Sequence, residues 1–130
     1  MVKYILFVCN ENSARSQMSE AFFNHYNKNP EYAALSAGLK KTDAIKPYAL
    51  EVMKEKGIDM TAQKPKMLTF DMIADAYRIY TMGCIKSCTA APPEKTFDWE
   101  LKDPAGKPID EYRKVRDDIE SKIKDLLMKL

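Results

Sequence analysis

The sequence predicts an α/β protein built on a parallel sheet. Short stretches rich in β-branched and aromatic residues, typical of buried strands, alternate with longer stretches of helical periodicity. A strand, a helix and a second strand in this order form a unit whose right-handed crossover makes the two strands parallel. The candidate strands are residues 3–8, 32–38, 77–81 and 96–99, and the candidate helices are residues 16–27, 47–56, 68–75 and 109–128.

The elements of the first half end at recognisable residues. The helix after Ser16 carries an apolar stripe, and Pro30 makes its continuation unfavourable. The next candidate strand ends at Gly38. Pro47 suits the first turn of the second helix, and Gly57 is a typical stop after it.

The second half contains the least regular part of the chain. Residues 82–94 carry Gly83, two cysteines and a Pro-Pro pair, which predicts a long irregular loop. Loops of this length in compact domains are usually functional or mobile. The final helix, residues 109–128, has an apolar face and an opposite face of alternating charges, a pattern typical of core packing rather than of a partner-binding surface.

The composition indicates one globular domain spanning residues 1–130. A net charge of +2, with basic and acidic residues interspersed, does not favour nucleic-acid binding. The N-terminal apolar run of five residues is too short for a signal-peptide core or a membrane span, so we expect a cytoplasmic protein without membrane association. The chain has three cysteines, an odd number, and the cytoplasm is reducing, so a permanent disulfide framework is not expected. We also expect a monomer.

The chain is organised around the segment that joins the first strand to the first helix. Cys9 ends the strand, and we name the residues after it the oxyanion loop: Asn10, Glu11, Asn12, Ser13, Ala14, Arg15 and Ser16. A loop from a strand to a helix N-terminus directs backbone N–H groups and the positive end of the helix dipole to one point. Such a point attracts a tetrahedral oxyanion.

Individual residues of the loop support a nucleophilic role for Cys9. Arg15 follows six positions later, so its guanidinium can bind two oxygens of an anion above the sulfur. The helix N-terminus, the N–H donors and Arg15 favour the thiolate, which is the reactive form of cysteine. Asn12 tolerates the left-handed backbone that a loop without glycine requires, and Ser16 offers a hydroxyl to the sulfur. The alternative is a buried apolar Cys9 beside a solvated Arg15.

Several motifs in order resemble the low-molecular-weight tyrosine phosphatase superfamily, and within it the arsenate reductases. They are Cys9 to Ser16, Met18-Ser19-Glu20, Ser36-Ala37-Gly38, Gly57-Ile58-Asp59, Thr81-Met82-Gly83-Cys84 and Asp103-Pro104-Ala105-Gly106-Lys107, so the resemblance covers nearly the whole chain. It implies a three-layer α/β/α fold with a central four-stranded parallel sheet, low-molecular-weight phosphatase-like and flavodoxin-like. It also implies that the polar loop 40–46 frames the entrance to the substrate site.

The activity that the resemblance favours is reduction of arsenate to arsenite. Cys9 would attack arsenic, and Cys84 and Cys88 would carry the resulting disulfide away. An external thiol carrier, thioredoxin-like by resemblance, would reduce that disulfide, and no tightly bound cofactor is expected. One alternative is a phosphatase acting on phosphotyrosine or small phosphoesters, because phosphate and arsenate share geometry and charge. Another is a non-enzymatic redox or oxyanion sensor.

Cys84 and Cys88 separate these activities. Both follow a strand of a parallel sheet, so they belong at the edge where Cys9 lies. If the segment is helical, Cys84 and Cys88 lie one turn apart, which is close enough for a disulfide, but their side chains are poorly oriented for a relaxed one. We therefore expect the segment to change shape when the two cysteines pair. Two alternatives are a zinc site formed with Cys9 and His25, and a pair of unrelated buried cysteines. His25 by itself suits a structural or solvated role in the last turn of its helix.

Asp103 is the candidate general acid. A bound oxyanion favours the protonated form of a facing carboxyl group, which can then donate to a departing oxygen. Spacing alone leaves Asp98 and Asp110 equally eligible, and Asp103 is chosen on the resemblance of its Asp-Pro-x-Gly-Lys pattern.

The resemblance has two further consequences. Some relatives bind a structural potassium ion near the loop, and Asn12, Glu20 and Ser36 match positions implicated there. Thr89 follows Cys88 where reductases often have proline, a departure that bears on the identity of the reductant.

Overall fold

The chain folds around one parallel sheet, as the sequence predicts. The structure, a computed structural model, describes residues 2–40, 42–83 and 92–130. The strands are β1 (Lys3–Cys9), β2 (Tyr32–Gly38), β3 (Ala76–Thr81) and β4 (Thr96–Asp98). They pair in the order β2-β1-β3-β4, and every pair is parallel. The prediction of four parallel strands is therefore confirmed.

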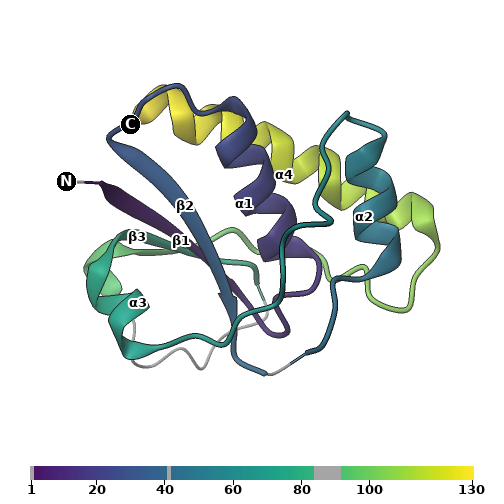
Figure 1. Cartoon of the computed structure of the whole chain (residues 1–130), viewed down its shortest axis with the longest axis horizontal. Coiled ribbons are helices and arrows are strands. Elements are labelled where there is room, and N and C mark those ends of the chain that lie inside the picture. The colour runs from purple at the N-terminus through teal and green to yellow at the C-terminus, as the bar shows by residue number, and fades with distance from the viewer. Residues whose placement is uncertain (1, 41, 84–91) are drawn as a thin grey trace.

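Helices cover both faces of the sheet and complete the three predicted layers. Figure 1 shows α1 (Arg15–Tyr26), α2 (Pro47–Lys54) and α4 (Ile109–Lys129) on one side and the short α3 (Phe70–Asp75) on the other. A single 3-10 turn, η1 (Pro93–Lys95), precedes β4. None of the helices within the described parts of the chain is long and apolar enough to cross a membrane.

Strand β1 is buried on both faces, which fixes the side of the sheet on which Cys9 lies. Ile5, Phe7 and Cys9 belong to the larger core, together with apolar residues of α1, α2 and α4. Leu6 and Val8 point the other way, into the smaller core under α3. Because successive side chains of a strand alternate between faces, Cys9 emerges on the side of α1.

The predicted boundaries hold to within two residues, with local reasons for the differences. Helix α3 begins at Phe70 rather than at residue 68, because the Thr69 side chain accepts a hydrogen bond from the Met72 N–H and caps it. Helix α2 ends at Lys54, and Gly57 follows with a φ of 75°. Of the predicted irregular loop 82–94, residues 84–91 lie outside the described residues, and both Cys84 and Cys88 lie with them.

Gly38 connects the sheet to the oxyanion loop. It ends β2 beside Cys9, and the N–H groups of the two residues that follow it donate to the Asn10 carbonyl. A Cβ atom at Gly38 would lie 2.7 Å from the backbone N of Asn12. The loop therefore rests directly on this glycine, and no larger residue leaves room for it.

The last turn of α2 is joined to α4 by charged groups. The Glu55 carboxylate accepts hydrogen bonds from Arg113 Nη2 at 2.8 Å and from Arg116 Nη1 at 2.6 Å. The hydrogen bonds from Arg113 and then Arg116 lower the pKa of Glu55 from 4.5 to about 2. Arg116 also donates to the Val52 carbonyl, so its guanidinium binds both a backbone carbonyl in the last turn of α2 and the Glu55 carboxylate just after it.

Gly38→Ala should displace the oxyanion loop. We expect a loss of about 1–3 kcal/mol in the free energy of unfolding, the usual cost of overpacking, together with weaker binding of inorganic phosphate. Denaturant unfolding and calorimetric titration measure the two effects. Gly57→Ala is the control, because it strains a left-handed residue with no atom within 4 Å of the new Cβ. It should lower stability and leave phosphate binding unchanged.

Glu55→Gln should lower stability at neutral pH but not in strong acid. A carboxyl group whose pKa is depressed by folding stabilises the fold fully above its ordinary pKa of 4.5, and this contribution is lost as the pH falls to about 2. The difference in unfolding midpoint between the wild type and Glu55→Gln should therefore be largest at pH 7, smaller at pH 4 and smallest at pH 2. Asp125→Asn, which removes an exposed pair with Lys129, should change stability little at any pH.

Candidate active site

The oxyanion loop surrounds a small pocket at the carboxyl end of β1. Its volume of about 30 Å³ suits a group of a few atoms, since one water needs about 10–15 Å³ by the same measure. The pocket is lined by Cys9, Asn10, Glu11, Ser13, Ala14, Arg15, Lys46, Asp103 and Ala105. Cys9, Arg15 and Asp103, which the sequence predicts as partners, thus face one space.

The Cys9 sulfur is almost fully buried and surrounded by donors. The Asn12 N–H donates to Sγ at 3.1 Å, and the Ser16 hydroxyl lies 2.8 Å from it. Asn12 Nδ2 donates to Ser16 Oγ at 2.7 Å, which leaves the hydroxyl hydrogen of Ser16 free to point at the sulfur. Two hydrogen-bond donors can therefore point at the Cys9 sulfur.

Arg15 is held from behind, so that its guanidinium has a fixed position. Nη1 donates to the carbonyls of Met82 at 2.7 Å and Leu101 at 3.1 Å, and the residue is only 5% exposed. The other donors of the guanidinium remain for a ligand in the pocket.

The N-terminus of α1 adds to this positive end. No side chain caps the helix and no acidic residue lies in its first turn, so its N–H groups are available to an anion.

Asn12 shapes the loop. Its φ of 54° lies in the left-handed region, as the sequence predicts for a loop without glycine. Its buried side chain accepts hydrogen bonds at Oδ1 from Gln17 Nε2 and from the Lys66 N–H, both at 2.8 Å. The contacts from Gln17 and Lys66 were not predicted, because neither residue belongs to a recognisable motif.

Asp103 is the one of the three candidate aspartates that lines the pocket. Its Oδ2 lies 3.7 Å from Arg15 Nη2, and its Oδ1 accepts a hydrogen bond from the Ala105 N–H at 3.0 Å. Asp98 instead accepts from the Glu100 N–H, and Asp110 pairs with Arg113 at the start of α4. The structure therefore distinguishes Asp103 from Asp98 and Asp110, which sequence spacing alone does not.

The entrance of the pocket carries charges of both signs. Lys46 Nζ lies 3.7 Å from the Glu11 carboxylate, and both residues line the pocket. The Lys46 N–H also donates to the Ser13 carbonyl, which ties the loop ahead of α2 to the oxyanion loop. Burial raises the pKa of Tyr112, and the negative charges of Asp103 and Glu11 raise it further, so this phenol stays neutral.

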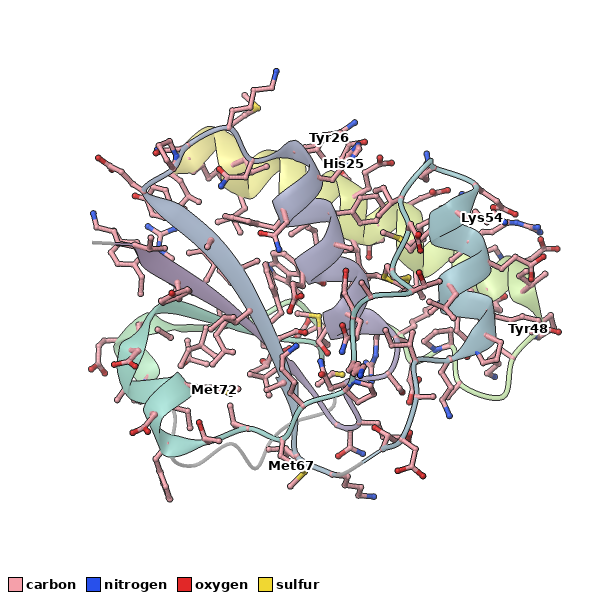
Figure 2. All side chains as sticks on the ribbon, in the orientation of Figure 1. His25, Tyr26, Tyr48, Lys54, Met67 and Met72 are labelled. Atoms are coloured by element: carbon pink, nitrogen blue, oxygen red, sulfur yellow. The ribbon has the colours of Figure 1, made fainter. Side chains whose placement is uncertain are left out.

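His25 takes no part in this site. It is exposed in the last turn of α1, edge-on to Tyr26, at the opposite end of the helix from the oxyanion loop (Figure 2). The rise of α1 separates its first turn from His25 by about 15 Å, too far for Cys9 and His25 to bind one zinc ion. Within residues 2–40, 42–83 and 92–130, no three His, Cys, Asp or Glu side chains are grouped to hold a metal.

Glu20 and Ser36, matched to a potassium site by resemblance, lie together. The Ser36 hydroxyl donates to Glu20 Oε1 at 2.7 Å. The third residue, Asn12, directs its Oδ1 to Gln17 and Lys66 instead.

Comparison with known proteins gives a consistent picture. A curated arsenate reductase of Brevibacillus brevis is 36% identical over 126 residues, covering 94% of this chain and 92% of its own. The structure of a low molecular weight protein tyrosine phosphatase from T. tengcongensis superposes with a TM-score of 0.89 at 27% identity, over 98% of this chain and 99% of the other.

A third relative carries a reductant in its name. The thioredoxin-dependent arsenate reductase of Corynebacterium glutamicum superposes with a TM-score of 0.82 at 31% identity, over 98% of this chain and 61% of the other. The sequence pattern of the family described as low molecular weight phosphotyrosine protein phosphatase matches residues 4–130. With its pocket, fold and relatives in agreement, the chain belongs to the low molecular weight phosphotyrosine protein phosphatase family.

Proposed function

We propose that this protein reduces arsenate to arsenite with three cysteines of its own chain. The observation that carries the proposal is a pocket for a small oxyanion built on a nucleophilic cysteine, in a chain with two further cysteines just after β3. A phosphatase of this family needs only the first of these thiols. The names of the Brevibacillus and Corynebacterium relatives support the same choice.

In the first step the Cys9 thiolate attacks arsenic. The loop N–H groups and Arg15 hold the oxygens of hydrogen arsenate, and Asp103 protonates its hydroxyl oxygen, which leaves as water. A sulfur–arsenic bond forms and one arsenic–oxygen bond breaks, so that arsenic remains pentavalent on Cys9.

In the second step the Cys84 thiolate attacks the Cys9 sulfur. The sulfur–arsenic bonding pair goes to arsenic, which leaves as trivalent arsenite, and a Cys9–Cys84 disulfide forms. Cys88 then attacks Cys84 and releases the Cys9 thiolate. The two thiols of Cys84 and Cys88 have supplied the two electrons.

Chain connectivity supports access of Cys84 to Cys9. The Met82 carbonyl contacts the Arg15 guanidinium, and Cys84 is two residues further along. Since consecutive Cα atoms are about 3.8 Å apart, the Cα atoms of Met82 and Cys84 are at most about 7.6 Å apart. The described chain therefore reaches Arg15 at Met82, two residues before Cys84 in the sequence.

The disulfide of Cys84 and Cys88 has to be reduced from outside the chain. We infer a thioredoxin-like carrier, in line with the name of the Corynebacterium relative, and a cytoplasmic location where thiols stay reduced. No tightly bound cofactor enters this scheme.

Phosphatase activity is the second candidate, because phosphate and arsenate share geometry and charge. The T. tengcongensis neighbour carries that name. Among the residues that the structure describes, those lining this pocket include no aromatic side chain to pack against a phenyl ring, and Glu11, Lys46 and Asp103 make its entrance charged. A small inorganic oxyanion suits such an entrance better than an aryl ester.

The relay is tested by Cys84→Ser and Cys88→Ser in a paired assay. With an external dithiol carrier, Cys84→Ser should form no arsenite because no second thiol can expel it. Cys88→Ser should lose sustained turnover and release at most about one equivalent of arsenite, because Cys9 then stays in its disulfide with Cys84. Hydrolysis of p-nitrophenyl phosphate, if present in the wild type, should survive both. Cys9→Ser should abolish both reactions.

Two results would contradict the proposal. One is phosphoester turnover by the wild type without arsenate reduction under any thiol reductant. The other is unchanged arsenite formation in the two serine variants.

The role of Asp103 is tested against a matched aspartate. Asp103→Asn should lower the rate of arsenite formation about 10²- to 10⁴-fold, the usual contribution of a general acid. Asp98→Asn, outside the pocket, should keep the wild-type rate. Equal losses in both variants would show that Asp103 has no special role in proton transfer.

A further inference from the structure

We infer that Lys66 is a positioning residue for the oxyanion loop and that its ammonium takes the place of a monovalent cation beneath it. The inference rests on the oxyanion pocket of the proposed function and not on the cysteine relay. Lys66 lies between α2 and α3, in a segment that crosses the carboxyl edge of the sheet, where Figure 2 labels its neighbour Met67.

The backbone of this segment is fastened to the sheet and to the loop. The Lys66 carbonyl accepts from the Gly38 N–H at 2.8 Å, and the Gly38 carbonyl accepts from the Leu68 N–H at 2.9 Å. The Lys66 N–H donates to Asn12 Oδ1. Asn12 in turn donates to Ser16, whose hydroxyl lies against the Cys9 sulfur. A continuous chain of hydrogen bonds therefore connects Lys66 to the nucleophile.

The side chain of Lys66 meets a largely buried carboxylate. Its Nζ lies 3.5 Å from Glu20 Oε1, and the Glu20 side chain is only 13% exposed. Ser36, fully buried, donates to the same oxygen at 2.7 Å. A carboxylate in this position needs a cation, because an unpaired buried charge is costly, and Lys66 is the one that reaches it among the residues the structure describes.

A potassium ion does not fit these residues. Asn12 Oδ1 already accepts two N–H donors, which uses both of its lone pairs. An ion between Asn12, Glu20 and Ser36 would also lie close to the Lys66 ammonium and be repelled by it. The chain thus supplies the positive charge covalently, and the loop should be formed without added potassium.

The test measures the dissociation constant of inorganic phosphate by calorimetry, in choline chloride and in potassium chloride of equal ionic strength. The wild type should bind equally well in both salts. Lys66→Met should bind about tenfold more weakly in choline, since an uncompensated Glu20 disturbs the hydrogen bonds of the loop. Potassium beside Glu20 and Ser36, where the ammonium no longer repels it, should restore part of the loss. Lys66→Arg should behave as the wild type.

Two further variants keep the inference falsifiable. Lys64→Met removes an exposed lysine two residues away and should change nothing. Lys66→Met combined with Glu20→Gln removes both charges, so it should fold and bind phosphate as the wild type does, without a response to potassium. Tighter binding by the wild type in potassium, or a loss in Lys66→Met that is equal in both salts, would overturn the inference. Neither result depends on arsenate turnover.

Discussion

The site depends on one backbone conformation, the left-handed Asn12 at the centre of a loop that contains no glycine. This conformation costs about 1–2 kcal/mol for an ordinary residue. It is held by hydrogen bonds from Gln17 and Lys66 to the side chain, and in return it aims the Asn12 N–H at the Cys9 sulfur. Without it the donors of the loop would not converge on a single point.

The sheet gives this loop its rigid base. Strand β1 lies between β2 and β3, with side chains buried on both faces, so the position of Cys9 at its end is closely fixed. Gly38, at the end of β2, supports the loop from one side. The carbonyl of Met82, just past β3, holds Arg15 from the other. A parallel sheet brings these strand ends to one edge, and the chemistry collects there.

Charged groups are paired in two separate places, one at the pocket and the other at Glu20 and Lys66 beside the oxyanion loop. Within the pocket, the helix N-terminus and Arg15 remain available to an anion, and the acidic Glu11 and Asp103 lie at the entrance, each near a basic group. Beneath the loop, Glu20 and Lys66 neutralise each other. Anion binding therefore depends on the donors of the helix N-terminus and of Arg15, not on the net charge of the whole chain, which is only +2.

The sequence by itself determined the order and type of the elements, the parallel sheet, the oxyanion loop and the left-handed Asn12. These follow from periodicity, propensity and short motifs, which are properties of neighbouring residues. Only the tertiary structure decided that Asp103 rather than Asp98 or Asp110 lines the pocket, and that Lys46 and Lys66 belong to the site. Contacts between residues far apart in sequence depend on how the packed layers bring loops together, and no local pattern encodes that.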